Sequence, residues 1–152
     1  MPGHAAPEPQ TRLPTLPCAC ANLRRAARTV SRLYNQALRA DGIEIAQFTL
    51  LLALNQTGEI PQGALGELLA IDSTTLTRTL RPLKKRRWVQ IRPGDDRRQR
   101  LLSLTPTGRA KLEAATPSWV RAQTALETAL GSETFRQLGG LSARVAAVST
   151  AS

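Results

Sequence analysis

The chemically distinctive part of the 152-residue chain is a cluster of cations between residues 73 and 109. It holds eleven lysine and arginine residues against Asp95 and Asp96, so +9 of the formal charge of +10 lies there. Charge concentrated in this way predicts a binding surface for an anionic partner. A run of cations taken alone is also typical of a solvated surface, so the elements that carry the cations decide between the two interpretations.

A helix is predicted to begin at the start of this cluster, because Asp72 or Ser73 can accept hydrogen bonds from its first free N–H groups. Leu76, Leu80 and Leu83 follow the spacing i, i+4, i+7 and are expected to face the core. The opposite face then presents short hydroxyl groups followed by arginines, which suit the major groove of duplex DNA. The residues expected on that face are Ser73, Thr74, Thr75, Thr77, Arg78 and Arg81.

A two-stranded hairpin is predicted directly after this helix. "RWVQIRP" alternates apolar and polar side chains, "GDDRR" supplies a turn and "QRLLSLTP" returns. The tip carries Arg97 and Arg98, with Arg100 just behind. A helix–turn–helix followed by a basic-tipped hairpin is typical of a winged helix, whose hairpin arginines can enter the minor groove. The order of helix, cap and hairpin therefore favours double-stranded DNA as the anionic partner.

The rest of the chain predicts further helices. Hydrophobic residues make up 41% of the sequence and aromatic residues 3%, which favours helices over a β-sandwich. A long amphipathic helix is expected at about residues 18–40, and a second one within residues 45–58. A short third helix is expected to open with Pro61 at its first position and to place Leu65, Leu68 and Leu69 on one side. The predicted fold class is mainly α with a small β-hairpin.

The start of the chain predicts a flexible arm over residues 1–17, because it is rich in proline and lacks the basic and apolar regions of a signal peptide. No apolar run approaches the roughly 20 residues that a membrane span needs, so no membrane partner is expected. Cys18 and Cys20 lie too close together for the disulfide framework of a secreted protein. These features together predict a cytoplasmic protein.

The sequence resembles the MarR (multiple antibiotic resistance) family of bacterial winged-helix regulators over about residues 18–148. The most specific match is "DDRRQRLLSLTPTGRA", which fits the family's signature for the hairpin. In that register Asp96 and Arg98 are the signature pair, and Leu104, Thr105 and Gly108 follow. The stretch "LGELLAIDSTTLTRTLRPLKKRRWV" matches the paired helices less specifically, because helix–turn–helix patterns are generic.

Two residues of the predicted recognition helix and its exit depart from the usual pattern. The family usually has glycine with a positive φ just before "WV", where this chain has Arg87. That conformation costs a residue other than glycine about 1 kcal/mol or more. Pro82 removes a hydrogen bond inside the helix, which predicts a bend or an early loosening of the last turn.

The resemblance implies one domain over residues 18–152, with dimerisation helices at about 18–40 and 107–149 and a winged helix–turn–helix at about 44–105. A homodimer would present two recognition helices to a palindromic operator. The C-terminal helices support a dimer independently, because they carry more apolar side chains than one small winged helix can bury. These residues are Leu112, Trp119, Val120, Leu126, Leu130, Phe135, Leu138, Leu141, Val145 and Val148. Packing within one chain is the alternative.

An effector site is implied between the dimer helices and the DNA-binding lobe, and either a small molecule or a thiol-directed agent could be the effector. The expected lining is Arg28, Tyr34, Gln47, Phe48, Leu51 and Trp119. Cys18 and Cys20 could act as a redox sensor or as soft-metal ligands, although two small buried hydrophobic residues are the favoured interpretation. His4 is the single histidine and lies in the predicted arm, so no zinc site is expected.

Catalytic chemistry has little support in the sequence. The predicted folded region has no histidine, no G-x-S-x-G motif and no glycine-rich phosphate loop, so neither an enzyme nor a cofactor is expected. The function predicted is an effector-responsive transcriptional repressor that binds a palindromic operator. The alternative is a non-specific or architectural nucleic-acid-binding protein without an effector, which would show steep salt dependence and weak sequence preference.

Overall fold

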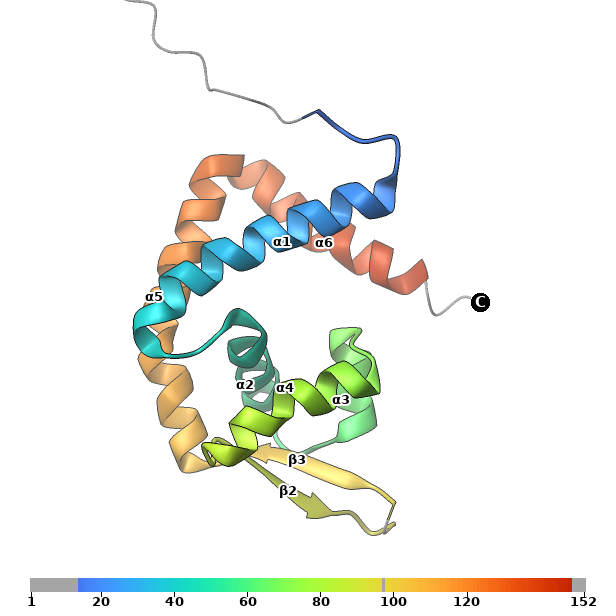
Figure 1. The fold of residues 1–152 in the computed structure, drawn as a ribbon, viewed down its shortest axis with the longest axis vertical. Coiled ribbons are helices and arrows are strands. Elements are labelled where there is room, and N and C mark those ends of the chain that lie inside the picture. Colours follow the sequence, from blue (N-terminus) through green and yellow to red (C-terminus); the bar gives the residue numbers. More distant parts are fainter. Residues whose placement is uncertain (1–13, 97, 149–152) are drawn as a thin grey trace, which may run out of the picture.

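The computed structural model describes residues 14–96 and 98–148 (Figure 1). Helices dominate the described residues, and a small antiparallel sheet completes them. The elements in chain order are α1 (Ala19–Leu38), the 3-10 helix η1 (Arg39–Asp41), α2 (Ile45–Thr57), β1 (Ile60–Pro61), α3 (Gln62–Leu69), α4 (Ser73–Lys85), β2 (Val89–Pro93), β3 (Arg100–Leu104), α5 (Pro106–Leu130) and α6 (Ser132–Val148). The predicted fold class is confirmed.

The helices fall into two groups that α5 connects. In Figure 1, α1 and α6 cross at one end, while α2, α3, α4 and the sheet form the other end. The long α5 begins beside the sheet and runs to the crossing. The sheet lobe is thus connected to α1 and α6 through α5 and through the contact of α1 with α2.

The core lies around α2, which is apolar on nearly every side. Phe48, Leu50, Leu51 and Leu54 of this helix are all buried. A helix that is apolar all round is typical of one with neighbours on every face, and here α1, α4, α5 and β3 all contact it. The fully buried leucines outside α2 are Leu38, Leu65, Leu76, Leu80, Leu83 and Leu102.

The sheet has three strands in the order β1-β3-β2, where the sequence predicted a two-stranded hairpin. Ile60 pairs with Leu102 and Pro61 with Leu101, so Pro61 ends a strand and directly precedes α3. The prediction that Pro61 is the first residue of the helix is wrong by one position. An edge strand of two residues tolerates proline and is too short to show an alternating pattern.

Leu68 does not share the buried face of α3 that the sequence predicted. Leu65 is fully buried and Leu69 is half-buried, but Leu68 is 58% exposed. The apolar pattern of an eight-residue helix contains only two turns, so it does not decide which of two adjacent leucines faces the core.

The helix α4 does not end early at Pro82. It continues to Lys85, and the N–H of Arg86 donates to the Pro82 carbonyl at 3.0 Å. A proline removes only one donor from the helix, and the buried Leu80 and Leu83 on either side hold this turn against the core.

Several apolar side chains of the C-terminal helices stay uncovered in the single chain. Leu112 is buried, and Trp119, Leu126 and Phe135 are half-buried. The exposed ones are Val120, Leu130, Leu138, Leu141, Val145 and Val148. None of the helices among residues 14–96 and 98–148 has the length and apolar character of a membrane span.

Candidate nucleic-acid interface

The N-terminal end of α4 is capped by Asp72. Its Oδ1 accepts the N–H of Thr75 at 2.8 Å, and its Oδ2 accepts the Thr75 hydroxyl at 2.6 Å. The hydrogen bonds from the side chain and backbone of Thr75 lower the pKa of Asp72. Of the two caps that the sequence allowed, the structure selects Asp72, and the Thr75 hydroxyl serves the cap instead of the outer face.

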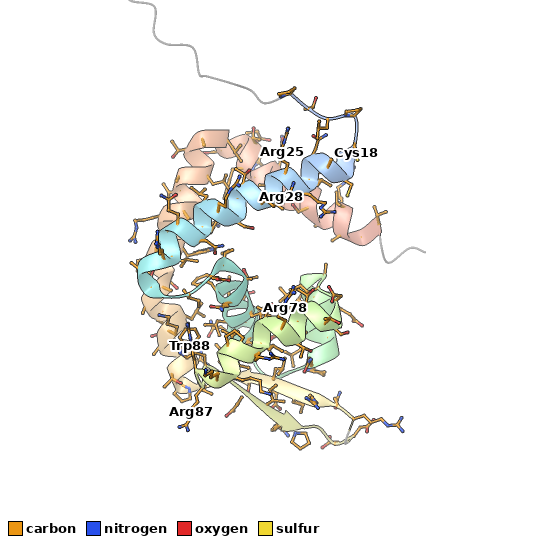
Figure 2. All side chains as sticks on the ribbon, viewed as in Figure 1. Cys18, Arg25, Arg28, Arg78, Arg87 and Trp88 are labelled. Atoms are coloured by element: carbon orange, nitrogen blue, oxygen red, sulfur yellow. The ribbon has the colours of Figure 1, made fainter. Side chains whose placement is uncertain are left out.

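The outer face of α4 carries the residues that the sequence predicted there. Leu76, Leu80 and Leu83 are buried on the opposite side. The exposed residues of the helix include Ser73, Thr74, Thr77, Arg78 and Arg81 (Figure 2 labels Arg78). The face is therefore a row of short hydroxyl groups followed by guanidinium groups, as the spacing of the leucines indicated.

The loop between β2 and β3 is shaped by Asp96 through the main chain. Its Oδ1 accepts the backbone N–H of Arg98 at 3.0 Å, and its carbonyl accepts the N–H of Gln99 at 2.8 Å. The Arg98 side chain is exposed and Arg100 is exposed at the start of β3. The carboxylate and the carbonyl of Asp96 therefore stabilise the turn that contains Arg98. The predicted Arg97 lies outside the described residues.

The helix and the loop face one concave surface. Ser73, Thr77, Arg98 and Arg100 line the same hollow of about 950 Å³, which we call the helix–wing surface. A smaller hollow of about 330 Å³ next to it is lined by Thr77, Arg81 and Arg100. Side chains separated by more than 20 residues thus converge on one place. Glu67 and Asp72 offset the charge of the two arginines in the larger hollow, whereas the smaller one is lined by cations without an acid.

Two cations of the cluster hold the lobe together instead. Arg92 of β2 pairs with Glu59 before β1, donating from Nε to Oε2 at 2.6 Å. This contact lowers the pKa of Glu59 and raises the pKa of Arg92. Arg109 of α5 donates to the Asn55 side chain at 2.5 Å. These contacts fix the sheet and α5 to the end of α2, so the charge of the cluster is not all directed at a partner.

The C-terminal end of α4 closes with two hydrogen bonds around Arg87. The N–H of Trp88 donates to the Leu83 carbonyl and the N–H of Arg87 to the Lys84 carbonyl, both at 2.9 Å. This pattern places a left-handed residue after the helix, and Arg87 has φ +57. Arg87 therefore adopts the left-handed conformation that glycine usually has at this position in the family's pattern.

The exit of α4 is joined directly to the start of α5. The Arg87 carbonyl accepts the hydroxyls of Thr105 at 2.6 Å and Thr107 at 2.8 Å. Thr105 also caps α5 by accepting the N–H of Gly108 at 3.0 Å. A Cβ atom on Gly108 would lie 2.0 Å from the Trp88 carbonyl oxygen, so only glycine fits there. Thr105 and Gly108 of the hairpin signature therefore join the end of α4 and the start of β2 to the start of α5.

The residues predicted to line an effector site are only partly brought together. Tyr34 and Trp119 line one hollow of about 550 Å³ between α1, α5 and α6, where the Tyr34 hydroxyl donates to Gln123 and burial raises the pKa of Tyr34. Phe48 stacks on Trp119 with ring centres 5.7 Å apart, but it is buried. Leu51 is fully buried, Gln47 lies in the capping box of α2 and Arg28 is exposed on α1 (Figure 2).

The two cysteines are exposed at the start of α1. Cys18 precedes the first helical residue, and its carbonyl accepts the N–H of Asn22 at 3.1 Å. The favoured prediction that both are buried hydrophobic residues is wrong for the single chain, because helix α1 extends beyond the elements that could cover its first turn. His4 lies outside the described residues, and no cluster of metal-ligating side chains occurs within them.

The comparisons with known proteins agree with this geometry. Residues 41–99 match the MarR family. The HTH-type transcriptional regulator YwoH of Bacillus subtilis is 31% identical over 91 residues, which cover 60% of this chain and 66% of that protein. The HTH-type transcriptional repressor NicR of Pseudomonas putida is 32% identical over 96 residues, covering 62% and 61%. The chain thus spans just under two thirds of these curated relatives.

A solved structure extends the match over most of the fold. The Mycobacterium tuberculosis transcriptional regulator MosR, crystallised with DNA, is 30% identical, with a TM-score of 0.79 over 88% of this chain and 97% of that one. These relatives are regulators, which supports the prediction that the chain is not an enzyme. The hairpin signature, the paired helices and the fold agree, and the chain belongs to the MarR family.

Proposed function

We propose that the protein is a sequence-specific transcriptional repressor that binds a palindromic double-stranded DNA operator as a homodimer in the cytoplasm. The observation that carries this proposal is the helix–wing surface, where hydroxyl groups of α4 and the wing arginines Arg98 and Arg100 line one hollow. The DNA complex of MosR and the repressor name of NicR support it.

The two parts of the surface have different roles in the proposal. Thr74, Thr77 and Arg78 read base edges in the major groove, since an arginine can bond in bidentate fashion to guanine. The wing arginines Arg98 and Arg100 contact phosphates and the minor groove beside it. Phosphate contacts supply affinity and base contacts supply sequence preference.

The homodimer is supported by an apolar stripe on α6. Leu138, Leu141, Val145 and Val148 recur at steps of three and four residues, and each is at least 39% exposed. This spacing puts them on one face of the helix, and an apolar stripe of that kind is typical of a helix that packs on a partner. A second copy of α6 related by a two-fold axis would cover both stripes and set two recognition helices about one DNA turn apart.

The hollow lined by Tyr34 and Trp119 is the proposed place of a small organic effector. It has aromatic walls and a few polar groups, which is the usual composition of a ligand site. A thiol-directed effector is the second candidate, because Cys18 and Cys20 are exposed and accessible to oxidants or soft metal ions. Operator binding by wild type and by a Cys18→Ser/Cys20→Ser variant, with and without peroxide, separates the two candidates.

Selection of duplexes from a random pool by the full chain tests the function. A palindrome with two half-sites, bound by a dimer in analytical ultracentrifugation, is the expected result. Binding that depends steeply on salt but shows no sequence preference would instead identify a non-specific nucleic-acid-binding protein.

A further inference from the structure

The indole ring of Trp88 is contacted by two cations from different elements. The Arg86 guanidinium carbon is 4.8 Å from the ring centre, and the Lys111 ammonium nitrogen is 5.2 Å from it. Both distances are within the range of a cation–π contact. Arg86 and Trp88 belong to the exit of α4, whereas Lys111 belongs to α5. We call these three residues the Trp88 cluster.

Both cations of the Trp88 cluster also reach the corner between α1 and α2. Arg86 donates from Nη1 to the Gly42 carbonyl at 2.8 Å, and the Lys111 ammonium donates to the Asp41 carbonyl. Asp41 ends η1, which directly continues α1, and Gly42 follows it with φ +64. Two adjacent carbonyls at the end of the α1 segment therefore hold the two cations that contact the ring.

The exit of α4 has little freedom to move independently of these contacts. The Arg87 and Trp88 carbonyls accept hydrogen bonds from Thr105. The backbone of Gly108 lies so close to the Trp88 carbonyl that a Cβ atom would not fit between them. Figure 2 shows Arg87 and Trp88 together where α4 meets α5, far along the helix from its N-terminal end. The orientation of α4 is consequently constrained at the end that does not read DNA in the proposed function, in addition to the buried Leu76, Leu80 and Leu83 along the helix.

The length of α4 amplifies a small rotation at this exit. A 13-residue helix is about 20 Å long, so a tilt of about 10° about its C-terminal end moves its N-terminal end by roughly 3.5 Å. That displacement is about the distance between successive base pairs. Residues such as Thr74 would then face a neighbouring base step.

We propose that the Trp88 cluster is a positioning set that fixes the recognition helix relative to α1 and thereby determines which half-site spacing the protein accepts. The effect on half-site spacing rests on the proposed function, whereas the effect on the orientation of α4 does not. Arg86 and Lys111 act through Trp88 and not by contact with bases. Removing either cation removes one contact of the ring with the corner between α1 and α2 and widens the range of α4 orientations.

The first experiment measures the orientation of α4 without DNA. Nitroxide labels are placed at Gln36→Cys on α1 and Arg81→Cys on α4 in the Cys18→Ser/Cys20→Ser background. Labelled chains are diluted with unlabelled protein, so that pulsed electron resonance reports distances within one chain. Arg86→Gln and Lys111→Gln should each broaden the distance distribution. Lys85→Gln, an exposed residue of the same turn that loses the same charge, should leave the distribution unchanged.

The second experiment measures spacing preference with the duplex that wild type selects and with the same duplex carrying one inserted base pair between half-sites. The affinity ratio is the affinity for the selected duplex divided by the affinity for the lengthened duplex. Arg86→Gln and Lys111→Gln should each reduce this ratio at least about fivefold relative to wild type, which is the lower end of the usual coupling between sites. The double variant should lose little more than either single variant, because both act on one ring. Lys85→Gln should weaken both duplexes equally.

These measurements separate the failure of each idea. Unchanged distance distributions in Arg86→Gln and Lys111→Gln would overturn the positioning role, whatever the protein does with DNA. Broadened distributions with an unchanged affinity ratio would overturn the spacing role. If wild type selects no duplex, the proposed function fails while the distance measurement still decides the role of the cluster. Thermal melting tests whether each variant is folded. Trp88→Phe, which keeps an aromatic ring, serves as the conservative control.

Discussion

The two ends of the recognition helix α4 are built in opposite ways. At the N-terminal end, Asp72 bonds Thr75 and leaves Ser73 and Thr74 exposed. At the C-terminal end, the carbonyls of Arg87 and Trp88 accept hydrogen bonds from Thr105, and two cations contact the indole ring. One end is left open to a partner and the other is held by neighbouring elements.

In the proposed function, this difference would allow a short helix to bind DNA in a defined register. In that proposal the open end needs free polar groups, which gain their hydrogen bonds from DNA. The held end needs its polar groups satisfied within the chain, because unpaired buried carbonyls would cost free energy and permit other orientations. Substitutions in the hydrogen-bonded backbone at the held end should therefore affect folding, whereas substitutions of the exposed Ser73, Thr74 and Arg78 near the open end should mainly affect DNA binding.

The largest effect is expected from Gly108→Ala at the held end. The new methyl group would lie 2.0 Å from the Trp88 carbonyl oxygen, so α5 or the exit of α4 must move. We expect the free energy of unfolding to fall by about 3 kcal/mol or more, as in severe overpacking. Chemical denaturation measures this. Gly63→Ala in α3 is the control, because space around Gly63 is open and the change should be within about 1 kcal/mol. Equal stability of the two variants would contradict the close contact.

At the open end, Arg78→Ala should weaken operator binding by about 1–3 kcal/mol and relax preference at one or two base positions in each half-site. The thermal stability should hardly change, since the Arg78 side chain is exposed. Titrations with the selected operator and with random duplex measure the two affinities. Arg24→Ala on α1, at the far end of the molecule, removes the same charge and should have little effect. An equal loss on operator and random DNA would show that Arg78 contacts only phosphates.

A smaller effect of opposite sign is expected from Arg87→Gly. Glycine removes the strain of the left-handed conformation at φ +57 but gains freedom in the unfolded chain, so we expect a net stabilisation of up to about 1 kcal/mol. Ala70, which ends α3 with φ +51, provides an internal comparison through Ala70→Gly. Denaturation curves measure both variants, and a clear loss of stability in Arg87→Gly would mean that the arginine side chain contributes more than its backbone costs.

The smallest effect is a pH dependence of the cap. Because folding lowers the pKa of Asp72, its contribution to stability is present above its ordinary value of 3.8 and is lost as pH falls through the folded pKa. Wild type should therefore melt at a higher temperature than Asp72→Asn near neutral pH. The two melting temperatures should converge below about pH 4. A constant difference across this range would mean that the carboxylate charge does not matter for the cap.

Much of the site was predictable because its signals are local. The leucines of α4 occur at helical spacing, the Asp72 cap lies three residues from Thr75, and the turn at Asp96 involves its own neighbours. Hydrogen bonds over two to four residues depend on residue types that stand side by side in the sequence. The family's pattern has a positive φ at the position of Arg87, but only the structure shows that an arginine adopts it there.

The sequence by itself thus determined the α4 helix, its reading face and the basic loop. Only the tertiary structure decided the third strand, the exposure of Leu68, Cys18 and Cys20, and the separation of Arg28 and Gln47 from the hollow of Tyr34 and Trp119. It also decided the Trp88 cluster, where Lys111 reaches a carbonyl 70 residues away. The physical reason is that such contacts depend on how helices pack in three dimensions. The spacing of residues along the chain does not determine which distant residues this packing brings together.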